Sequence, residues 1–340
     1  MKEAPLTIVG APGSPYSRKL RAVLRYRRIP HRWVNRGTAE NEGLPRPRVE
    51  LLPQLVFPGA KEALTDTSPL IRRLENSYEG RSVIPDDPAL AFLDALLEDY
   101  ADEWLTKPMF HYRWAYEDDI AQAAAILPRW FQISGPEAEA REAGKVFSAR
   151  QIGRLGVVGS NPTTAPIIEA SYRRLLERLA ARLSEAPFVF GSRPASSDFG
   201  LYGQLTQLTG FDPTPRKVAL EVAPRVTAWV DLVEDLSGAE PKDGGWSSRD
   251  ALTDGFRGLF VEVGRVYAPF LLANADAIGR GAEQVECTID GRPWVQKPFP
   301  YQGKCLMWLR EGYAALAPSD RATVDAFLAG TGCEALFPGS

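Results

Sequence analysis

Residues 6–24 read LTIVGAPGSPYSRKLRAVL, and this stretch decides the fold expected for the first part of the chain. The apolar run Leu6–Gly10 predicts a strand, and residues 11–15 end it because they are rich in Pro and Gly. Ser14 is a good helix cap and Pro15 suits a first helical turn, so a helix is expected over residues 15–28. The stretch therefore predicts a strand-to-helix turn that carries a hydroxyl group.

The segments that follow change from strands to helices near residue 80. Strands are expected over residues 31–35, within 49–57 and over 63–65, and a second helix over 68–76. Residues 79–88 are rich in Pro, Asp and Gly and predict a domain boundary. Beyond it the apolar spacing is that of helices, over residues 89–104, 108–122, 166–183, 199–208 and 224–236.

A third segment begins near residue 238. Residues 249–274 predict a long helix, and residues 287–295, with Asp-Gly at their centre, predict a β-hairpin. Two closing helices are expected over residues 302–316 and 319–328. Residues 134–160, which precede this segment and are rich in Gly, Ala and charge, are expected to be partly mobile.

Composition excludes several classes of protein. The 340 residues carry 40 basic and 43 acidic side chains, a balance that gives no sign of a nucleic-acid-binding surface. No apolar run approaches the roughly 18 residues that span a membrane, and no signal peptide is expected. Cys287, Cys305 and Cys333 are odd in number, which argues against a disulfide framework and favours a cytoplasmic protein. Metal-ligand spacing is absent, so no metal site is expected.

Ser14-Pro15-Tyr16-Ser17 has the layout of the Cys-Pro-Tyr-Cys site of glutaredoxins, with serine in both cysteine positions. Serine cannot supply the thiolate that disulfide exchange needs. Its hydroxyl can instead donate to the thiolate of a bound thiol, helped by the positive end of the helix. The alternative is that Ser14 only caps the helix. Tyr16 and Ser17 are further candidate donors, and Arg18 can hold an anionic ligand. The other basic residues of this helix, Lys19 among them, are expected on a solvated face.

Two further elements carry a resemblance to known families. Leu52-Pro53 resembles the Val-Pro-x-Leu element of thioredoxin-like proteins, whose proline is cis and whose preceding backbone faces the ligand. The alternative is an ordinary edge-strand proline. Residues 64–71, LTDTSPLI, resemble the Leu-Thr-Glu-Ser-x-x-Ile element of glutathione transferases, which grips the γ-glutamyl end of glutathione. Asp66 stands for the Glu and Thr67 for the Ser; the alternative is that they cap a helix.

The helical part resembles the same family. Residues 187–200 contain its Gly-x-x-Pro and the following Asp198, although the capping hydroxyl position is Ala195, which Ser196 is expected to replace. The chain is therefore similar to glutathione S-transferases over residues 5–235. This resemblance implies an α/β thioredoxin-like domain over 1–80 and an all-helical domain over 88–237. The resemblance does not extend to residues 238–340, which are expected to form a mainly helical extension that contains a β-hairpin and packs on the helical domain.

Family resemblance also implies a pocket for the second substrate between the two domains. Aromatic residues are dense there, and Phe110, His111, Arg113 and Trp114 are the candidate pocket residues for a small hydrophobic or aromatic electrophile. The alternative is plain helix packing. The extension, with Pro300 and Tyr301 after its hairpin, is expected to cover the cleft, lengthen a domain or form a dimer contact.

The leading hypothesis is a glutathione-dependent transferase or lyase with a role in detoxification, which conjugates its co-substrate glutathione to the electrophile or uses it to cleave the electrophile. Ser14 would hold its thiol, Leu52 and Pro53 its backbone, and Asp66 and Thr67 its γ-glutamyl end. The alternatives are a non-catalytic binding or regulatory protein of the same fold and a glutathione-dependent isomerase. Family resemblance further implies a homodimer, with neither nucleic acid nor membrane as a partner.

Overall fold

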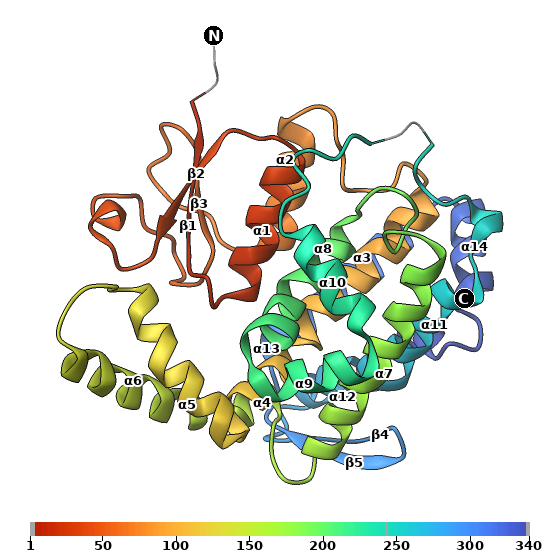
Figure 1. The fold of residues 1–340 in the computed structure, drawn as a ribbon. Coiled ribbons are helices and arrows are strands. Elements are labelled where there is room, and N and C mark those ends of the chain that lie inside the picture. The colour runs from red at the N-terminus through yellow and green to blue at the C-terminus, as the bar shows by residue number, and fades with distance from the viewer. Residues whose placement is uncertain (1–3, 242–243, 338–340) are drawn as a thin grey trace.

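A computed structural model describes residues 4–241 and 244–337 (Figure 1). The N-terminal part comprises β1 (Leu6–Gly10), α1 (Pro15–Tyr26), β2 (His31–Asn35), β3 (Gln54–Val56) and α2 (Thr67–Ser77). β1 is the central strand, parallel to β2 and antiparallel to β3, so the sheet is mixed. The strand expected over 63–65 is reduced to a single bridge between Leu55 and Leu64. This is the predicted thioredoxin-like arrangement.

The second part is helical, as predicted. Its helices are α3 (Pro88–Glu103), α4 (Thr106–Ala115), α5 (Glu117–Ile126), α6 (Glu137–Ile152), α7 (Ala165–Glu185), α8 (Ser196–Leu205), α9 (Pro213–Val222) and α10 (Pro224–Val233). α8 packs against both α3 and α1, which joins the two domains through their helices. α3 is buried on most of its surface, and this explains why its apolar residues, such as Leu93, Leu96 and Leu97, lie on more than one face.

Short helical turns link these elements. The 3₁₀ turns are η1 (Ala39–Asn41), η2 (Leu127–Trp130), η3 (Leu155–Val158), η5 (Arg249–Ala251) and η7 (Cys333–Leu336), and the π-helical turns are η4 (Thr206–Phe211) and η6 (Val263–Tyr267).

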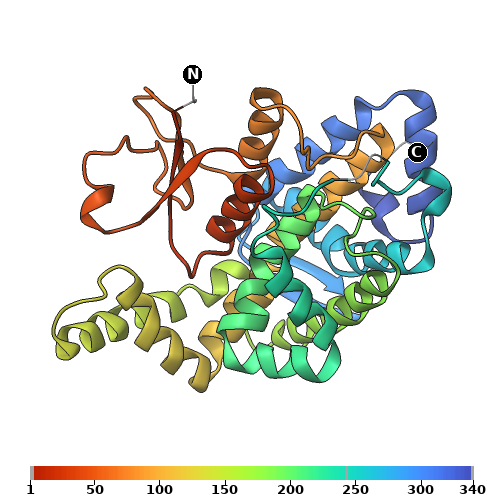
Figure 2. The same cartoon turned by 45° about the horizontal axis from the view of Figure 1, so that its top comes forward.

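Two expectations about residues 108–160 need correction. The single helix expected over 108–122 is two helices, because Tyr116 has extended backbone between α4 and α5. Residues 134–160, expected to be partly mobile, contain the 16-residue helix α6, whose Ala, Glu and Arg side chains have high helix propensity. Gly144 lies within this helix, where a Cβ would be 2.3 Å from the carbonyl oxygen of Ala124. The glycine therefore serves the close packing of α6 on α5, and these helices form a hairpin below the N-terminal sheet in Figures 1 and 2.

The extension begins with α11 (Asp254–Glu262) and α12 (Ala268–Gly279), so the long helix expected over 249–274 is interrupted by η6. β4 (Val285–Ile289) and β5 (Arg292–Gln296) form the predicted hairpin, and Asp290 and Gly291 at its turn both have positive φ, 52° and 71°. α13 (Pro300–Ala314) and α14 (Pro318–Leu328) follow the hairpin, as predicted.

The extension and α3 share one hydrophobic core. Both views show the blue C-terminal helices beside α3, and α13 and α14 contact it (Figures 1 and 2). Aromatic rings pair across this contact, at centroid distances of 5.3 to 6.0 Å: Phe92 with Tyr313 and Phe337, Tyr100 with Tyr267, and Trp104 with Phe270 and Trp294. The extension therefore completes the core of the helical domain.

Among the described residues, no helix is both long enough and apolar enough to cross a membrane.

Candidate functional site

Ser14 is the N-cap of α1, as the sequence predicts. Its Oγ accepts a hydrogen bond from the backbone N–H of Ser17 at 3.2 Å, and its own N–H donates to Ala11 O at 3.0 Å. The cap uses Ser14 Oγ as an acceptor, which leaves the hydroxyl hydrogen for another partner. Capping and donation to a ligand are therefore compatible roles for one hydroxyl.

The peptide bond between Leu52 and Pro53 is cis, the geometry that the resemblance implies. β3 pairs with β1 so that Gln54 lies opposite Val9. Continuing this register places Pro53 level with Gly10, at the end of β1 where the turn to α1 begins. Pro53 is buried and Leu52 is partly exposed, so the residue before the proline is the one accessible to a ligand.

Asp66 and Thr67 lie at the start of α2. Asp66 has a φ of 78°, a left-handed conformation that is uncommon for a residue with a side chain. Its carboxylate makes no capping bond; instead its Oδ2 accepts a hydrogen bond from the hydroxyl of Tyr301 at 2.6 Å. Thr67 is buried. Non-glycine residues held at positive φ cluster at ligand sites, which makes Asp66 the strongest site candidate on α2.

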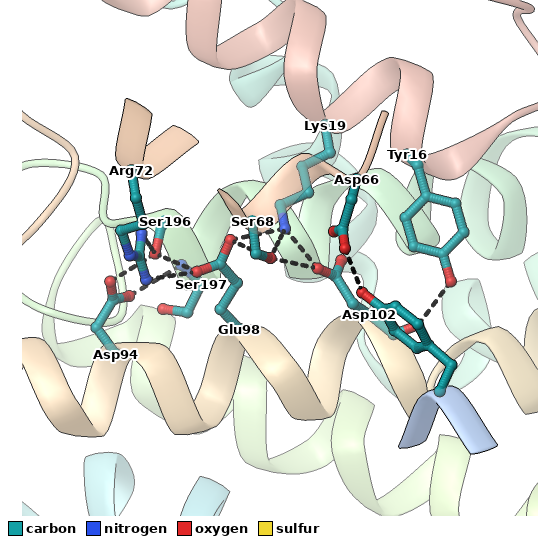
Figure 3. A network of polar contacts seen from close by, with 11 residues as sticks. Tyr16, Lys19, Asp66, Ser68, Arg72, Asp94, Glu98, Asp102, Ser196 and Ser197 are labelled. Carbon is teal, nitrogen blue, oxygen red and sulfur yellow. Dashed lines mark hydrogen bonds and ion pairs between the residues drawn. The ribbon is translucent and has the colours of Figure 1, made fainter. Parts of the chain in front are cut away.

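Lys19 lies directly behind this helix start, so the expectation of a solvated face is wrong for this residue. Its side chain is 1% exposed, and Nζ lies 2.7 Å from Glu98 Oε1 and 2.5 Å from Asp102 Oδ2 of α3. Ser68 Oγ is within 3.1 Å of all three groups. Figure 3 shows Lys19 pointing from α1 toward these two acids, with Ser68 between them. The solvated face is also wrong for Arg27, which is 5% exposed and pairs with Glu75.

Electrostatics in this cluster follow from burial and pairing. Burial alone would lower the pKa of Lys19, but the charges of Asp102 and Glu98 raise it above its usual value. Burial raises the pKa of Asp102, although Lys19 opposes the shift. For Glu98, Lys19 and Arg72 outweigh burial and lower the pKa. The cluster therefore holds charged groups in the interior only because each faces an opposite charge.

The same network continues toward the start of α8. Arg72 reaches Glu98 Oε2 at 2.7 Å, and Ser196 Oγ lies 2.6 Å from Asp94 Oδ2. Ser196 is the first residue of α8, and the N-cap is Ala195. The expectation that Ser196 replaces the missing capping hydroxyl is therefore wrong. The first turn of α8 is capped from α3, because Asp94 Oδ1 accepts from the N–H of Ser197 at 2.9 Å, while the Asp198 carboxylate accepts from the N–H groups of Ala195 and Val189 before the helix.

Further acids on α3 face the extension. Burial raises the pKa of Asp99 to about 7. Burial, together with the charges of Asp99 and Asp102, raises the pKa of Glu103 to about 8. Tyr267 donates to Asp99 Oδ2 at 2.6 Å, and Gln302 Nε2 donates to Glu103 Oε2 at 3.0 Å. The extension therefore supplies hydrogen bonds to acids that the helical domain buries.

The other candidates of the first helix bind protein atoms. Tyr16 Oη donates to the carbonyl of Asp102 at 2.8 Å, so it points into the helical domain. Ser17 is fully buried and its Oγ accepts from Ala11 N at 3.4 Å. Arg18 Nε donates to Pro12 O at 3.1 Å, and its guanidinium pairs with Glu234. Ser17 Oγ is likewise an acceptor, but Ser17 is fully buried, so the partly exposed Ser14 is the member of this segment whose hydroxyl hydrogen a ligand can reach.

The expected pocket residues lie mostly in packed surroundings. Arg113 is buried, pairs with Asp212 at 2.8 Å and donates to the carbonyl of Gly13 at 3.2 Å. His111 Nδ1 lies 2.8 Å from Ser160 Oγ, and its other ring nitrogen lies 3.1 Å from a carboxylate oxygen of Glu169.

Trp114 belongs to a small core with Leu127, and Phe110 packs on its ring at 6.3 Å. The α5–α6 hairpin adds to this packing, since a Cβ on Gly13 would lie 2.7 Å from both Leu127 and Trp130.

A depression of about 370 Å³ opens beside the turn before Ser14. Trp130 and Phe211, whose ring centroids are 5.1 Å apart, form its aromatic part, and Pro12 and Arg18 form the side nearest the turn. Sequence reasoning missed this place because Phe211 was not among the aromatic residues considered. The sequence also did not predict the contact of Tyr301 with Asp66. The aromatic residues that follow the hairpin were the one indication that this segment contacts another part of the protein.

The mixed sheet, the cis-proline and the attached helical domain define a two-domain protein of the thioredoxin-like class. Residues 8–82 match the family model of the glutathione S-transferase N-terminal domain, and residues 137–232 match that of the C-terminal domain. The chain belongs to the glutathione S-transferase family. Both matches end before the extension, and a search of curated protein sequences finds no match.

Several solved structures are similar to the chain. One is a glutathione S-transferase from Methylobacterium radiotolerans in complex with glutathione sulfonate, 18% identical, with 70% of this chain and 92% of that chain covered and a TM-score of 0.40. A glutathione S-transferase-like protein from Pseudomonas syringae is also 18% identical, with 73% and 82% covered and a TM-score of 0.40. A Tau class glutathione S-transferase from mango, Mangifera indica, is 15% identical, with 73% and 95% covered and a TM-score of 0.40.

Proposed function

We propose that the protein binds glutathione on its N-terminal domain and transfers the glutathione thiolate to a hydrophobic, aromatic electrophile. The observation that carries this proposal is the geometry of three elements of one small sheet domain. They are the Ser14 hydroxyl at the positive end of α1, the cis bond before Pro53 at the level of Gly10, and Asp66 at the start of α2. Family membership supports the same assignment.

Thiol activation would come from Ser14 and the helix end. The hydroxyl hydrogen can bond to the sulfur, and the unpaired N–H groups of α1 favour negative charge there. A hydrogen bond to a charged acceptor contributes about 1.5–3 kcal/mol, which corresponds to roughly tenfold to a hundredfold more thiolate at neutral pH. The main contribution of the protein would therefore be activation and positioning of the thiol.

The electrophile would bind in the depression beside Pro12, against the rings of Trp130 and Phe211. A volume of about 370 Å³ lies within the range of small-molecule sites. Aromatic walls favour a flat apolar compound, and the charge of Arg18 at the edge is already balanced by Glu234, which lines the same depression.

The test compares wild type with Ser14→Ala. Glutathione binding is measured by calorimetry, the bound thiolate by its ultraviolet absorbance, and turnover with 1-chloro-2,4-dinitrobenzene as the aromatic probe. Ser14→Ala is expected to keep glutathione binding and lose roughly tenfold to a hundredfold of thiolate and of turnover at neutral pH. Thr253→Ala is the matched control, because Thr253 Oγ1 also caps a helix at 3.2 Å but lies in the extension. A wild-type protein that binds no glutathione would refute the proposal.

A second candidate function is a non-catalytic glutathione-binding protein of the same fold. The observation that favours it is that Arg113 and His111, the polar members of the expected pocket, are engaged with protein groups. Binding of glutathione by a wild type that shows no turnover with aromatic electrophiles would select this function over a transferase.

A further inference from the structure

Tyr301 brings the extension into the candidate glutathione site. It lies in the first turn of α13, outside both segments that match the family models. Its hydroxyl donates to Asp66 Oδ2 at 2.6 Å, the short distance expected for an O–H donor and a carboxylate. The residue expected to grip the γ-glutamyl end of glutathione thus has a partner 235 positions away in the chain.

Hydrogen bonds to α12 and α3 fix the start of α13, so the position of Tyr301 beside Asp66 is well defined. Asn274 of α12 exchanges two hydrogen bonds with the backbone of Phe299, at 2.8 and 3.0 Å. Gln302, the residue after Tyr301, is buried and donates to Glu103 of α3 at 3.0 Å. The ring of Tyr301 also packs edge-on against Trp308, about two helical turns later, with ring centroids 6.0 Å apart.

The hydroxyl acts as a donor at ordinary pH. Burial, and then the hydrogen bond and charge of Asp66, raise the pKa of Tyr301 above its usual value. A carboxylate has about four acceptor positions on its two oxygens. One bond to Oδ2 therefore orients the Asp66 carboxylate and leaves Oδ1 for a ligand.

We propose that Tyr301 is a positioning residue of the glutathione site, which holds Asp66 so that its carboxylate meets the ammonium group of a γ-glutamyl ligand. The inference rests on the proposed function, because it assumes that glutathione binds at Asp66. Aspartate is one methylene shorter than the glutamate of the family pattern, and a side chain that is already oriented loses less freedom when the ligand binds. Fixing one polar side chain in advance is worth about 0.5–1.5 kcal/mol, or roughly threefold to tenfold in affinity.

Selectivity follows from the same geometry. The Tyr301 bond improves only the contact between Asp66 and the ligand's ammonium group. A ligand without that group, such as glutaryl-cysteinyl-glycine, gains nothing from the oriented carboxylate. Tyr301 therefore determines preference for γ-glutamyl peptides over their deaminated analogues.

The experiment titrates the full-length protein with glutathione and with glutaryl-cysteinyl-glycine by calorimetry. Tyr301→Phe removes one oxygen and keeps the ring. Tyr313→Phe is the matched control, because Tyr313 lies on the same helix and its hydroxyl donates to Asp325 at the same 2.6 Å. Tyr301→Phe is expected to weaken glutathione about threefold to tenfold and to leave the analogue unchanged. Tyr313→Phe is expected to change neither affinity.

Each other outcome overturns the assignment. Unchanged glutathione affinity in Tyr301→Phe would show that the bond does not serve binding, and equal weakening of both ligands would show a merely structural effect. Tighter glutathione binding in the variant would mean that Tyr301 obstructs the site. A wild type that takes up no glutathione would instead overturn the proposed function, and this assignment with it.

Discussion

Replacement of Lys19 by methionine tests the buried ion cluster between the domains. Methionine keeps the length and apolar stem of the side chain but removes the charge that faces Glu98 and Asp102. Removal of one partner of a buried pair costs about 3–5 kcal/mol, because the other charge is left without compensation. Arg72 still pairs with Glu98 at 2.7 Å, so only Asp102 loses its sole cationic partner in the cluster. We therefore expect Lys19→Met to lower the free energy of unfolding by about 3 kcal/mol, the lower end of this range.

The loss should depend on pH in a definite direction. Burial already raises the pKa of Asp102, and without Lys19 it rises further. A carboxyl whose pKa is raised in the folded state contributes stability below its unfolded pKa and loses it as the pH rises through the folded pKa. Lys19→Met should consequently cost less at pH 5 than at pH 8.

Urea unfolding at these two pH values, followed by tryptophan fluorescence, measures the effect. Lys145→Met is the control: the side chain of Lys145 is 76% exposed and its nitrogen lies 3.4 Å from Glu142, so its loss should cost less than about 1 kcal/mol. The reasoning is refuted if Lys19→Met is no more costly than this control at pH 8, or if it is more costly at pH 5 than at pH 8.

Two further predictions concern α3 and the turn before α1. Because burial raises the pKa of Glu103 to about 8, the protonated carboxyl stabilises the protein at lower pH, and this stability is lost as the pH rises through 8. Glu103→Gln, which cannot ionise, should therefore flatten the fall in thermal midpoint between pH 6 and 9. An unchanged profile would argue against a protonated Glu103. Gly13→Ala places a Cβ 2.7 Å from the ring of Trp130 and should push η2 away. Faster hydrogen exchange over residues 127–131 would report this, and unchanged exchange would contradict the close packing.

Local signals predicted the N-terminal fold and the hairpin of the extension well. The strand, turn and cap at Ser14, the cis-proline at position 53 and the Asp-Gly hairpin each depend on a few adjacent residues and on backbone geometry. Element ends and interruptions were harder to predict. The break at Tyr116 and the π-helical turn at 263–267 hardly change the spacing of apolar residues, so the periodicity did not predict them.

Long-range partners were beyond the sequence. Lys19 is on a helix rich in arginine, and its burial depends on Glu98 and Asp102, about 80 positions later. Nothing near Lys19 distinguishes it from Arg21 and Arg25 of that helix, which are only partly buried and pair with Glu234. Tyr301 and Asp66 are even further apart in sequence, and their contact depends on how the extension packs on α3.

The aromatic pairs between α3 and the extension have a consequence for biosynthesis. Phe92 is synthesised 221 and 245 positions before its neighbours Tyr313 and Phe337. At about 5–20 residues per second, the interval between them is on the order of ten to fifty seconds. During that time the face of α3 that packs against α13 and α14 has no native cover, so the helical domain completes its core only after the extension has been synthesised. A nonsense mutation at position 238 would leave that face bare permanently and would act as a folding defect, whatever the fate of the glutathione site.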